Sequence, residues 1–182
     1  LIKLITKAHL EGFYYKPRMD KELLRVHHEG LIALSGCYSS EVVQAILNDR
    51  QPENIISQYK EIFGPENFFL EIGHHPNFNP KHHEKVWGKL IELSQSTNTP
   101  LAATQDIHYS RPEDAEYHDI LLAVQTGNRL SDDDRLTLKA DDFSMTSPEQ
   151  MIEKFRDCPE AIINTVKIAE RCKVELELNK IR

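Results

Sequence analysis

Three short apolar runs, each followed by a helical pattern, limit what this chain can fold into more than any other feature. The runs cover residues 31–35, 68–72 and 101–105. Near-continuous apolar runs of this length are typical of strands that are buried on both faces, and strands that alternate with helices form parallel sheets. We therefore predict an α/β fold, for which a barrel and an open doubly wound sheet both fit. Three strands are too few to close a barrel, so either the sheet is open or the N-terminal strands of a barrel are missing.

Capping residues and prolines mark where the helices begin. Asp20 and Ser40 are N-cap residues by type and position, and Ser147 opens a capping box that Gln150 completes. Residues 1–10 have the pattern of the middle of a helix, and because the first residue is not methionine we expect a segment of a longer protein. The remaining signals, first-turn prolines and terminal glycines, complete a set of helices that begin near residues 21, 41, 52, 80, 112, 148 and 159.

The composition excludes several classes of protein. Hydrophobic residues make up 40% and charged residues 28% of the 182 residues, as expected for one globular domain. The net charge of −7 argues against a stand-alone, non-specific nucleic-acid binder, although it is compatible with an enzyme that handles nucleic acid with metals. The sequence shows no signal peptide and no run of 18 uncharged apolar residues. With only three scattered cysteines, the expected compartment is the reducing cytoplasm.

Potential metal ligands follow each of the three predicted strands. Cys37 comes just after the first strand, Glu71 and His74 lie at the end of the second, and Asp106 and His108 follow the third. In parallel α/β folds the carboxyl ends of the strands meet at one edge, where functional residues gather. We therefore expect these side chains to share one face of the molecule.

The Asp106–His108 pair is the most specific of these signals. Residues i and i+2 of an extended chain point to the same side, so a carboxylate and an imidazole can reach one ion. Oxygen and nitrogen ligands suit zinc, manganese or iron. The alternative is a loop aspartate that caps the next turn beside an exposed histidine. Cys37 is likewise either a thiolate that the next helix favours or a small residue that fills space.

Three further segments have both a structural and a functional interpretation. Residues 74–83 hold four of the nine histidines, of which we expect His82 and His83 to be solvated. Residues 11–20 combine aromatic and cationic side chains that can contact a base or a phosphate, but we favour an aromatic plug beneath a loop. Residues 128–146 form a polar, acidic excursion that is either solvated or a docking surface.

Several phrases, in order along nearly the whole chain, resemble one family. They include GLIALSGC at residues 30–37, ATQDIHY at residues 103–109 and PEDAEYHDILLAVQTG at residues 112–127. The chain is thereby similar to the bacterial DNA polymerase III alpha subunits, in the later part of their PHP (polymerase and histidinol phosphatase) domain. The resemblance implies that residues 1–127 form a partial, distorted (β/α)7 barrel without its N-terminal strands. Residues 128–182 would be a helical extension that leads towards the polymerase palm.

The resemblance also implies a site and an activity. Cys37, Asp106 and His108 match ligand positions of a cluster of divalent metals, zinc or manganese, which supports 3′–5′ exonuclease activity. The family's other ligands should lie upstream and the palm's catalytic aspartates, which use magnesium, downstream, so we expect the chain alone to be inactive. The implied partners are DNA, dNTPs, the sliding clamp, the clamp loader and the proofreading subunit, and no membrane.

Two other functions stay open. Some members of the family have lost ligands of the PHP site and keep the domain as a scaffold that binds a separate proofreading subunit. The other alternative is a free-standing PHP phosphatase that acts on a small phosphomonoester such as histidinol phosphate. Residues 147–176 and the FYYKPR phrase disfavour this alternative, because they resemble the polymerase branch of the family.

Overall fold

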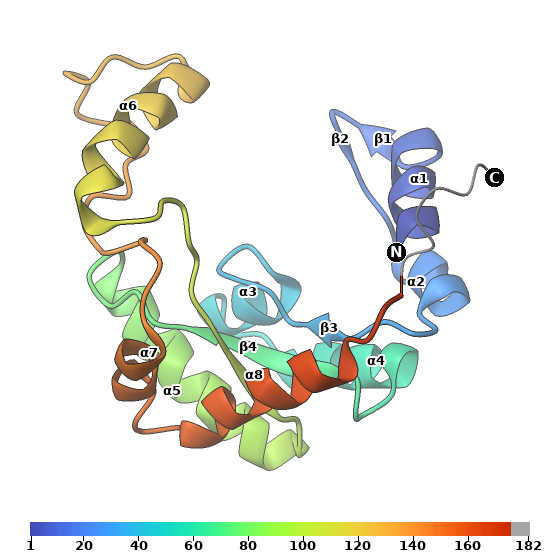
Figure 1. Ribbon diagram of the computed structural model, residues 1–182. Coiled ribbons are helices and arrows are strands. Elements are labelled where there is room, and N and C mark those ends of the chain that lie inside the picture. Colours follow the sequence, from blue (N-terminus) through green and yellow to red (C-terminus); the bar gives the residue numbers. More distant parts are fainter. Residues whose placement is uncertain (176–182) are drawn as a thin grey trace.

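The computed structural model describes residues 1–175 and contains the predicted parallel sheet. The register of the central and last strands aligns Leu70 with Leu101 and Gly73 with Thr104. The prediction of three parallel strands is confirmed, and in the described residues they form an open sheet. The strands lie side by side in the order β3 (Ala33–Leu34), β4 (Phe68–Gly73), β5 (Leu101–Thr104) (Figure 1).

The first strand is shorter than predicted. Only two of residues 31–35 form β3, although the N–H groups of Ala33 and Ser35 donate to the carbonyls of Asn67 (2.8 Å) and Phe69 (2.9 Å). Gly36 then has a φ of +83°, a backbone conformation that L side chains rarely adopt. This turn ends the strand and carries the chain to the next helix, with Cys37 in between.

Eight α-helices accompany the sheet in the described residues, and their starts follow the capping signals closely. The Asp20 carboxylate accepts a hydrogen bond from the N–H of Leu23 (2.8 Å), and Ser147 and Gln150 form the predicted capping box. Pro112 differs, because it starts a short 3-10 turn before the α-helix. The elements are α1 (Ile2–Leu10), α2 (Lys21–His27), α3 (Glu41–Leu47), α4 (Pro52–Phe63), α5 (Pro80–Thr97), η1 (Pro112–Asp114), α6 (Ala115–Thr126), α7 (Pro148–Lys154) and α8 (Pro159–Arg171).

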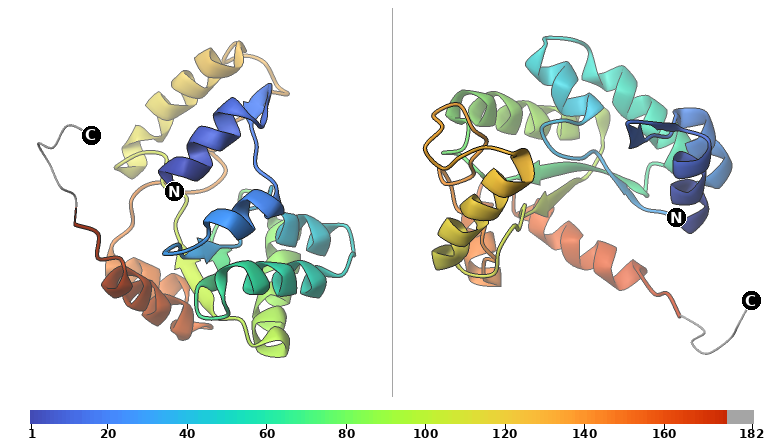
Figure 2. Two further views of the ribbon diagram at one scale, coloured as in Figure 1. Left: turned by 90° about the vertical axis from the view of Figure 1, so that its right-hand side faces the viewer. Right: turned by 90° about the horizontal axis from the view of Figure 1, so that it is seen from above.

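The sheet is covered on both faces. Seen from above, α8 lies on one side of the sheet, and α3, α4 and α5 lie on the other (Figure 2, right). Phe68, Leu70 and Ile72 of β4 are at most 1% exposed and pack in one core with Leu90 of α5 and Phe155 after α7. This two-sided burial explains why the strands are near-continuous apolar runs.

Helix α8 is fastened to the outer strand by a buried side chain. Asn164, which is 7% exposed, donates through Nδ2 to the carbonyl oxygen of Leu101 (2.8 Å). Ala161 of α8 and the preceding Cys158 belong to the same core as β4. The division of the chain at residue 127 into a PHP part and an extension stays a prediction. Helix α8, which belongs to the predicted extension, packs with the sheet. Residues 176–182 of the predicted extension lie outside the described residues.

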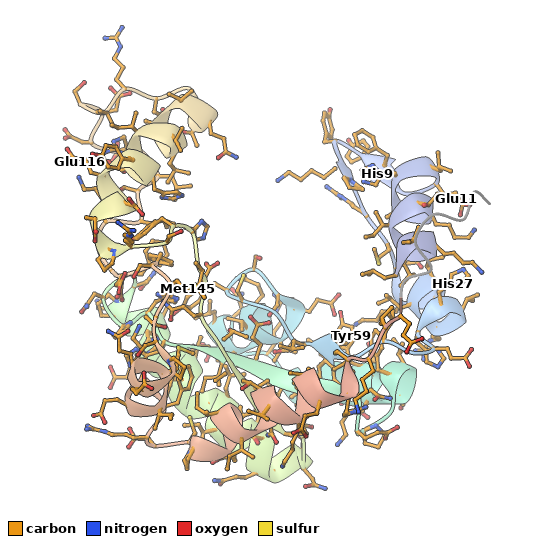
Figure 3. All side chains as sticks on the ribbon, viewed as in Figure 1. His9, Glu11, His27, Tyr59, Glu116 and Met145 are labelled. Carbon is orange, nitrogen blue, oxygen red and sulfur yellow. The ribbon has the colours of Figure 1, made fainter. Side chains whose placement is uncertain are left out.

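Two parts of the chain rise from the sheet at opposite ends of the molecule (Figure 1). One consists of α1 and a small hairpin, whose strands are β1 (Phe13–Tyr14) and β2 (Lys16–Pro17), and the other contains α6. Figure 3 shows His9 on the first part and Glu116 on the second, with Tyr59 of α4 at the base below the first part.

The hairpin corrects one interpretation of the sequence. Phe13, Tyr14 and Tyr15 are exposed, so the prediction of an aromatic plug beneath a loop is wrong. Strands β1 and β2 pair only with each other, and no other described strand extends their sheet. The Arg18 guanidinium lies 5.6 Å from the centre of the Tyr14 ring, a cation–π contact at the surface.

An ion pair ties the acidic excursion to α6. Asp119, 4% exposed, accepts hydrogen bonds from Nη1 and Nη2 of Arg135 and from Oγ1 of Thr137, each at 2.7 Å. The hydrogen bonds from Arg135, and after them the one from Thr137, hold the pKa of the Asp119 carboxyl far below its ordinary value. The excursion, which the sequence predicted to be solvated or a docking surface, is therefore anchored by a bidentate pair.

Replacing Asp119 with Asn should release residues 128–137 from α6, because Arg135 loses the charge that it neutralises. We expect amide hydrogen exchange in this segment to become at least about tenfold faster, while β4 and β5 keep their protection. Since folding lowers the pKa of Asp119, the stabilisation is present above the ordinary carboxyl pKa and is lost as the pH falls through the lowered value. Asp133→Asn, at an exposed position, is the control. Unchanged exchange in Asp119→Asn would contradict the anchoring role.

Candidate active site at the carboxyl ends of the strands

A cavity of about 620 Å³ opens beyond the carboxyl ends of the strands. Its volume falls within the range of small-molecule sites, about 300–1,000 Å³. As the strand-end rule predicts, Cys37, Glu71 and Asp106 line this one space, although each lies in or just after a different strand. Further lining residues come from α5 and from the end of the excursion, and they include Val86, Trp87, Leu90 and Phe143.

Asp106 and His108 are in direct contact. Asp106 Oδ1 lies 3.2 Å from His108 Nε2, and both side chains are partly exposed. The prediction that positions i and i+2 share a side is therefore confirmed for this pair. Asp106 lines the cavity, whereas His108 lies just outside the lining, with its ring 5.2 Å from that of His118 in α6. Together they can present an oxygen and a nitrogen to one ligand.

Residues 142–145, which we call the return strap, hold this pair in place. The N–H of His108 donates to the carbonyl of Phe143 (2.9 Å), and the N–H of Met145 donates to the carbonyl of Tyr109 (3.2 Å). The Tyr109 hydroxyl oxygen accepts from the N–H of Phe143 (3.0 Å). The end of the acidic excursion therefore runs alongside the residues that follow β5.

Glu71 and Cys37 are held differently. Glu71 Oε1 accepts a hydrogen bond from Thr104 Oγ1 (2.9 Å), and the Glu71 N–H donates to Ser35 Oγ (2.9 Å). Thr104 thus holds the carboxylate of Glu71, and Ser35 holds its backbone. Cys37 is exposed, and its Sγ lies 3.8 Å from Ser39 Oγ. The site combines a preorganised carboxylate with an accessible thiol.

The two histidines after β4 have different surroundings. His74 does not line the cavity, and its ring packs edge-on against those of Trp87 (5.3 Å) and Phe155 (6.2 Å). His75 does line it, is 5% exposed, and stacks on Phe143 with ring centres 4.2 Å apart and planes 6° apart. Alternation along an extended chain explains the difference, because Glu71 and His75 are an even number of residues apart.

His75 and Gln105 carry buried polar atoms without partners. Within the described part of the chain, neither ring nitrogen of His75 has a hydrogen-bond partner, and the Oε1 atom of Gln105 has none either. Burial lowers the pKa of His75, which favours the neutral imidazole. A buried polar atom left unsatisfied costs about 1–3 kcal/mol. Each of these three atoms is covered by surrounding protein atoms, so the unsatisfied groups lie within the wall of the cavity and not on its open surface.

The donor chemistry of the site suits a metal, but the described residues do not complete a metal site. Thiolate, carboxylate and imidazole are ligands that zinc accepts, and the oxygen and nitrogen donors also suit manganese. Within residues 1–175, however, no three His, Cys, Asp or Glu side chains are close enough together to hold an ion. Asp106 and His108 are two paired donors, and a complete site needs more. The metal-binding role of Cys37, Asp106 and His108 stays a prediction.

Sequence reasoning missed three residues of this cavity. The expectation that His83 is solvated is wrong, because His83 lines the cavity with its ring 5.3 Å from that of Trp87, one turn further along α5. His75 was within reach, since it lies on the same side of an extended chain as Glu71. Phe143, 3% exposed, gave no signal, because its neighbours in sequence are acidic and polar.

Comparisons with known proteins match this arrangement to a family. The model of the PHP domain family matches residues 1–75. DNA polymerase III subunit alpha of Treponema pallidum is 42% identical over 178 residues, which is 97% of this chain and 15% of that protein. The subunits of Borreliella burgdorferi and Thermus aquaticus are 40% and 41% identical over 94% and 98% of the chain, again 15% of each protein.

Residues 1–75 are thus similar to the PHP domain family, and we call the chain the PHP segment after this match. Over nearly its whole length the PHP segment is similar to one stretch of the DNA polymerase III alpha subunits, and it spans about 15% of their length. Cys37, Glu71 and His75 lie within the family match, whereas Asp106 and His108 follow it in the stretch that aligns with the polymerase subunits. Among the helices described, none has the length and apolar character needed to cross a membrane.

Thiol reactivity should separate the three cysteines and test Cys37 as a ligand. Cys158 is 1% exposed and burial raises the pKa of its thiol to about 11, so iodoacetamide should leave it unmodified at about pH 8. Cys37 and Cys172 are exposed and should react. In the full-length protein, zinc should slow alkylation of Cys37 at least about tenfold and leave Cys172, the internal control, unaffected. Equal Cys37 rates with and without zinc, measured by peptide mass spectrometry, would argue against ligation.

Proposed function

We propose that this PHP segment is part of a DNA polymerase III alpha subunit and contributes to a metal-dependent phosphoesterase that removes nucleotides from DNA 3′ ends. The observation that carries the proposal is the contact between Asp106 and His108 at 3.2 Å, beside a cavity that Cys37 and Glu71 also line. Such donors, gathered where strands end, are what a hydrolytic metal site requires. The names of the relatives support DNA as the substrate class.

The residues of the chain would act by holding and orienting. A bound zinc or manganese ion supplies the chemistry, by lowering the pKa of a coordinated water and neutralising charge on the phosphate. Asp106 and His108 would hold such an ion, and Cys37 would be a further donor. Glu71 keeps a carboxylate at a constant position through its hydrogen bond from Thr104. Because further ligands are needed, we expect the PHP segment alone to be inactive.

The wider role concerns the longer protein, of which the PHP segment would be about 15%. That protein would be a DNA-directed DNA polymerase, a nucleotidyltransferase that uses dNTPs and magnesium at a palm outside this chain. It would act in DNA replication in the cytoplasm, together with the sliding clamp, the clamp loader and the proofreading subunit.

A non-catalytic scaffold is the second candidate function. One observation favours it, namely that Asp106 and His108 are paired while no group of three donors exists within the described residues. In this alternative the PHP domain binds a separate proofreading subunit, and the anchored acidic excursion offers a rigid surface. A free-standing phosphatase is not favoured, because the chain is similar to polymerase subunits over nearly its whole length.

Alanine substitutions in the full-length protein separate the two candidates. Asp106→Ala and His108→Ala should each remove bound zinc or manganese and lower exonuclease activity at least about 100-fold, because each deletes a ligand. Metal content is measured by plasma mass spectrometry, and activity by release of a labelled 3′-terminal nucleotide. Asp133→Ala, at an exposed position away from the cavity, is the matched control.

The outcomes of this experiment exclude one another. Unchanged metal content and activity in both variants would refute the ligand assignment. A wild-type protein that binds no metal and has no exonuclease activity would support the scaffold instead.

A further inference from the structure

The hairpin of β1 and β2 presents three consecutive aromatic side chains to solvent. Phe13, Tyr14 and Tyr15 are 60%, 65% and 82% exposed. Single exposed apolar residues are ordinary on a protein surface, but a contiguous group of them marks a binding surface. None of the three residues lines the strand-end cavity. The hairpin is therefore a candidate binding surface separate from the proposed metal site.

One face of the hairpin combines an aromatic ring with two cations. The strand register places Tyr14 directly opposite Lys16, so the two side chains lie on the same face. The Arg18 guanidinium also lies against the Tyr14 ring, 5.6 Å from its centre. Among the described residues, no carboxylate forms an ion pair with Lys16 or Arg18. Both cations are thus available to an anionic partner.

The backbone of the hairpin holds these groups in place. Tyr15 lies between the two strands with a φ of +58°, which is uncommon for a residue other than glycine, and such conformations concentrate at functional sites. Its ring meets that of Tyr14 edge-on, with ring centres 4.7 Å apart. At the base of the hairpin, the N–H of Arg18 donates to the carbonyl of Gly12 (3.1 Å), and a Cβ at Gly12 would collide with the carbonyl oxygen of Arg18. The side chains are therefore presented by a closed turn.

The charge of this part of the chain favours a polyanion as the partner. Residues 1–18 hold four of the 22 Lys and Arg residues but one of the 29 Asp and Glu residues, although the whole chain has a net charge of −7. A polyanion is therefore attracted to this part and repelled by most of the remaining surface.

The exposed rings narrow the choice to a single strand of nucleic acid. Unpaired bases stack on aromatic side chains while the phosphates between them meet neighbouring cations. In a duplex, the faces of the bases are already stacked on one another and are closed to a protein ring. A purely ionic site for duplex phosphates would need the cations but not three exposed aromatic side chains.

We propose that the hairpin binds single-stranded DNA, with Tyr14 and Tyr15 stacking on bases and Lys16 and Arg18 contacting phosphates. This inference rests on the proposed function for DNA as the ligand, but it concerns a second surface. The hairpin and α6 rise at opposite ends of the molecule (Figure 1), and His118 of α6 is the residue whose ring lies 5.2 Å from that of His108. The hairpin thus holds a part of the strand other than its 3′ terminus.

The variants separate stacking from charge. Tyr15→Ala removes the most exposed ring, whereas Tyr15→Phe keeps a ring and should keep the function. Tyr117→Ala removes an equally exposed ring on α6 and is the matched control. Lys16→Ala removes one cation, and Lys81→Ala, at an exposed position of α5, is its control. All of these side chains are exposed, so the unfolding temperature should stay at the wild-type value in each variant.

The first measurement locates the DNA on the full-length protein. A single-stranded oligonucleotide that contains 5-iododeoxyuridine, irradiated on the protein in the presence of a metal chelator, should form crosslinks to Phe13, Tyr14 or Tyr15, mapped by peptide mass spectrometry. An excess of unlabelled single strand should suppress these crosslinks, and an equal amount of duplex should not. Tyr15→Ala should lower their yield at least about fivefold, while Tyr15→Phe and Tyr117→Ala keep it. A wild-type protein without crosslinks at the hairpin would overturn the proposal, because another part of the protein or a second copy would then cover this surface.

The second measurement tests the cations. For a single strand, each phosphate contact contributes about 0.7 to the slope of the logarithm of the association constant against the logarithm of the salt concentration. Fluorescence anisotropy of a labelled single strand on the full-length protein should therefore give a slope smaller by about 0.7 in Lys16→Ala and an unchanged slope in Lys81→Ala. Equal slopes in Lys16→Ala and the wild type would overturn the proposal, because the hairpin would then bind a partner other than a polyanion.

The same oligonucleotide distinguishes this proposal from the exonuclease function when manganese replaces the chelator. Crosslinks at the hairpin without release of the 3′-terminal nucleotide would support the hairpin site and refute the exonuclease function. Release of the nucleotide without crosslinks at the hairpin would overturn the hairpin site alone. The absence of both crosslinks and release would overturn both, and the presence of both would support both.

Discussion

The parallel register of β4 and β5 is the constraint on which the rest of the structure depends. Gly73 and Thr104 form the last pair, so both strands end at one level and the residues that follow them meet beyond the sheet. The hydrogen bond from Thr104 to Glu71 (2.9 Å) joins the strands at this point. A shift of β5 by one residue would break this bond and turn Asp106 towards the other face of the sheet. The core that packs the sheet against α5 and α8 fixes this register. It therefore also fixes which side chains meet at the carboxyl ends of the strands.

The return strap converts a polar excursion into a wall of the site. Phe143 stacks on His75 (4.2 Å) and meets His108 edge-on (5.6 Å), so one aromatic ring contacts two imidazoles. Its carbonyl also accepts from the His108 backbone, which couples the ring to the residues after β5. The ion pair between Asp119 and Arg135 secures the earlier part of the same excursion to α6. The packing of Phe143 and the ion pair between Asp119 and Arg135 thus together hold the return strap at the cavity.

Local signals predicted the elements well, because caps and apolar periodicity act within one or two turns. The positions of Cys37, Glu71 and Asp106 around one cavity followed from topology, since parallel strands present their carboxyl ends together. Burial of Phe143 and exposure of the hairpin aromatics could not be predicted, because both depend on contacts between distant segments that leave no periodic pattern. Of the two adjacent histidines after β4, only His75 lies an even number of residues after Glu71, so the sequence alone could have assigned it to the cavity.

The central claim is that the strand-end cavity is part of a metal-dependent hydrolytic site. Anomalous X-ray diffraction from crystals of the full-length protein grown with zinc tests this claim most directly, because it locates the metal itself. The account predicts an anomalous peak about 2.0–2.2 Å from a carboxylate oxygen of Asp106 and from a ring nitrogen of His108. A map whose peaks all lie away from this pair would contradict it.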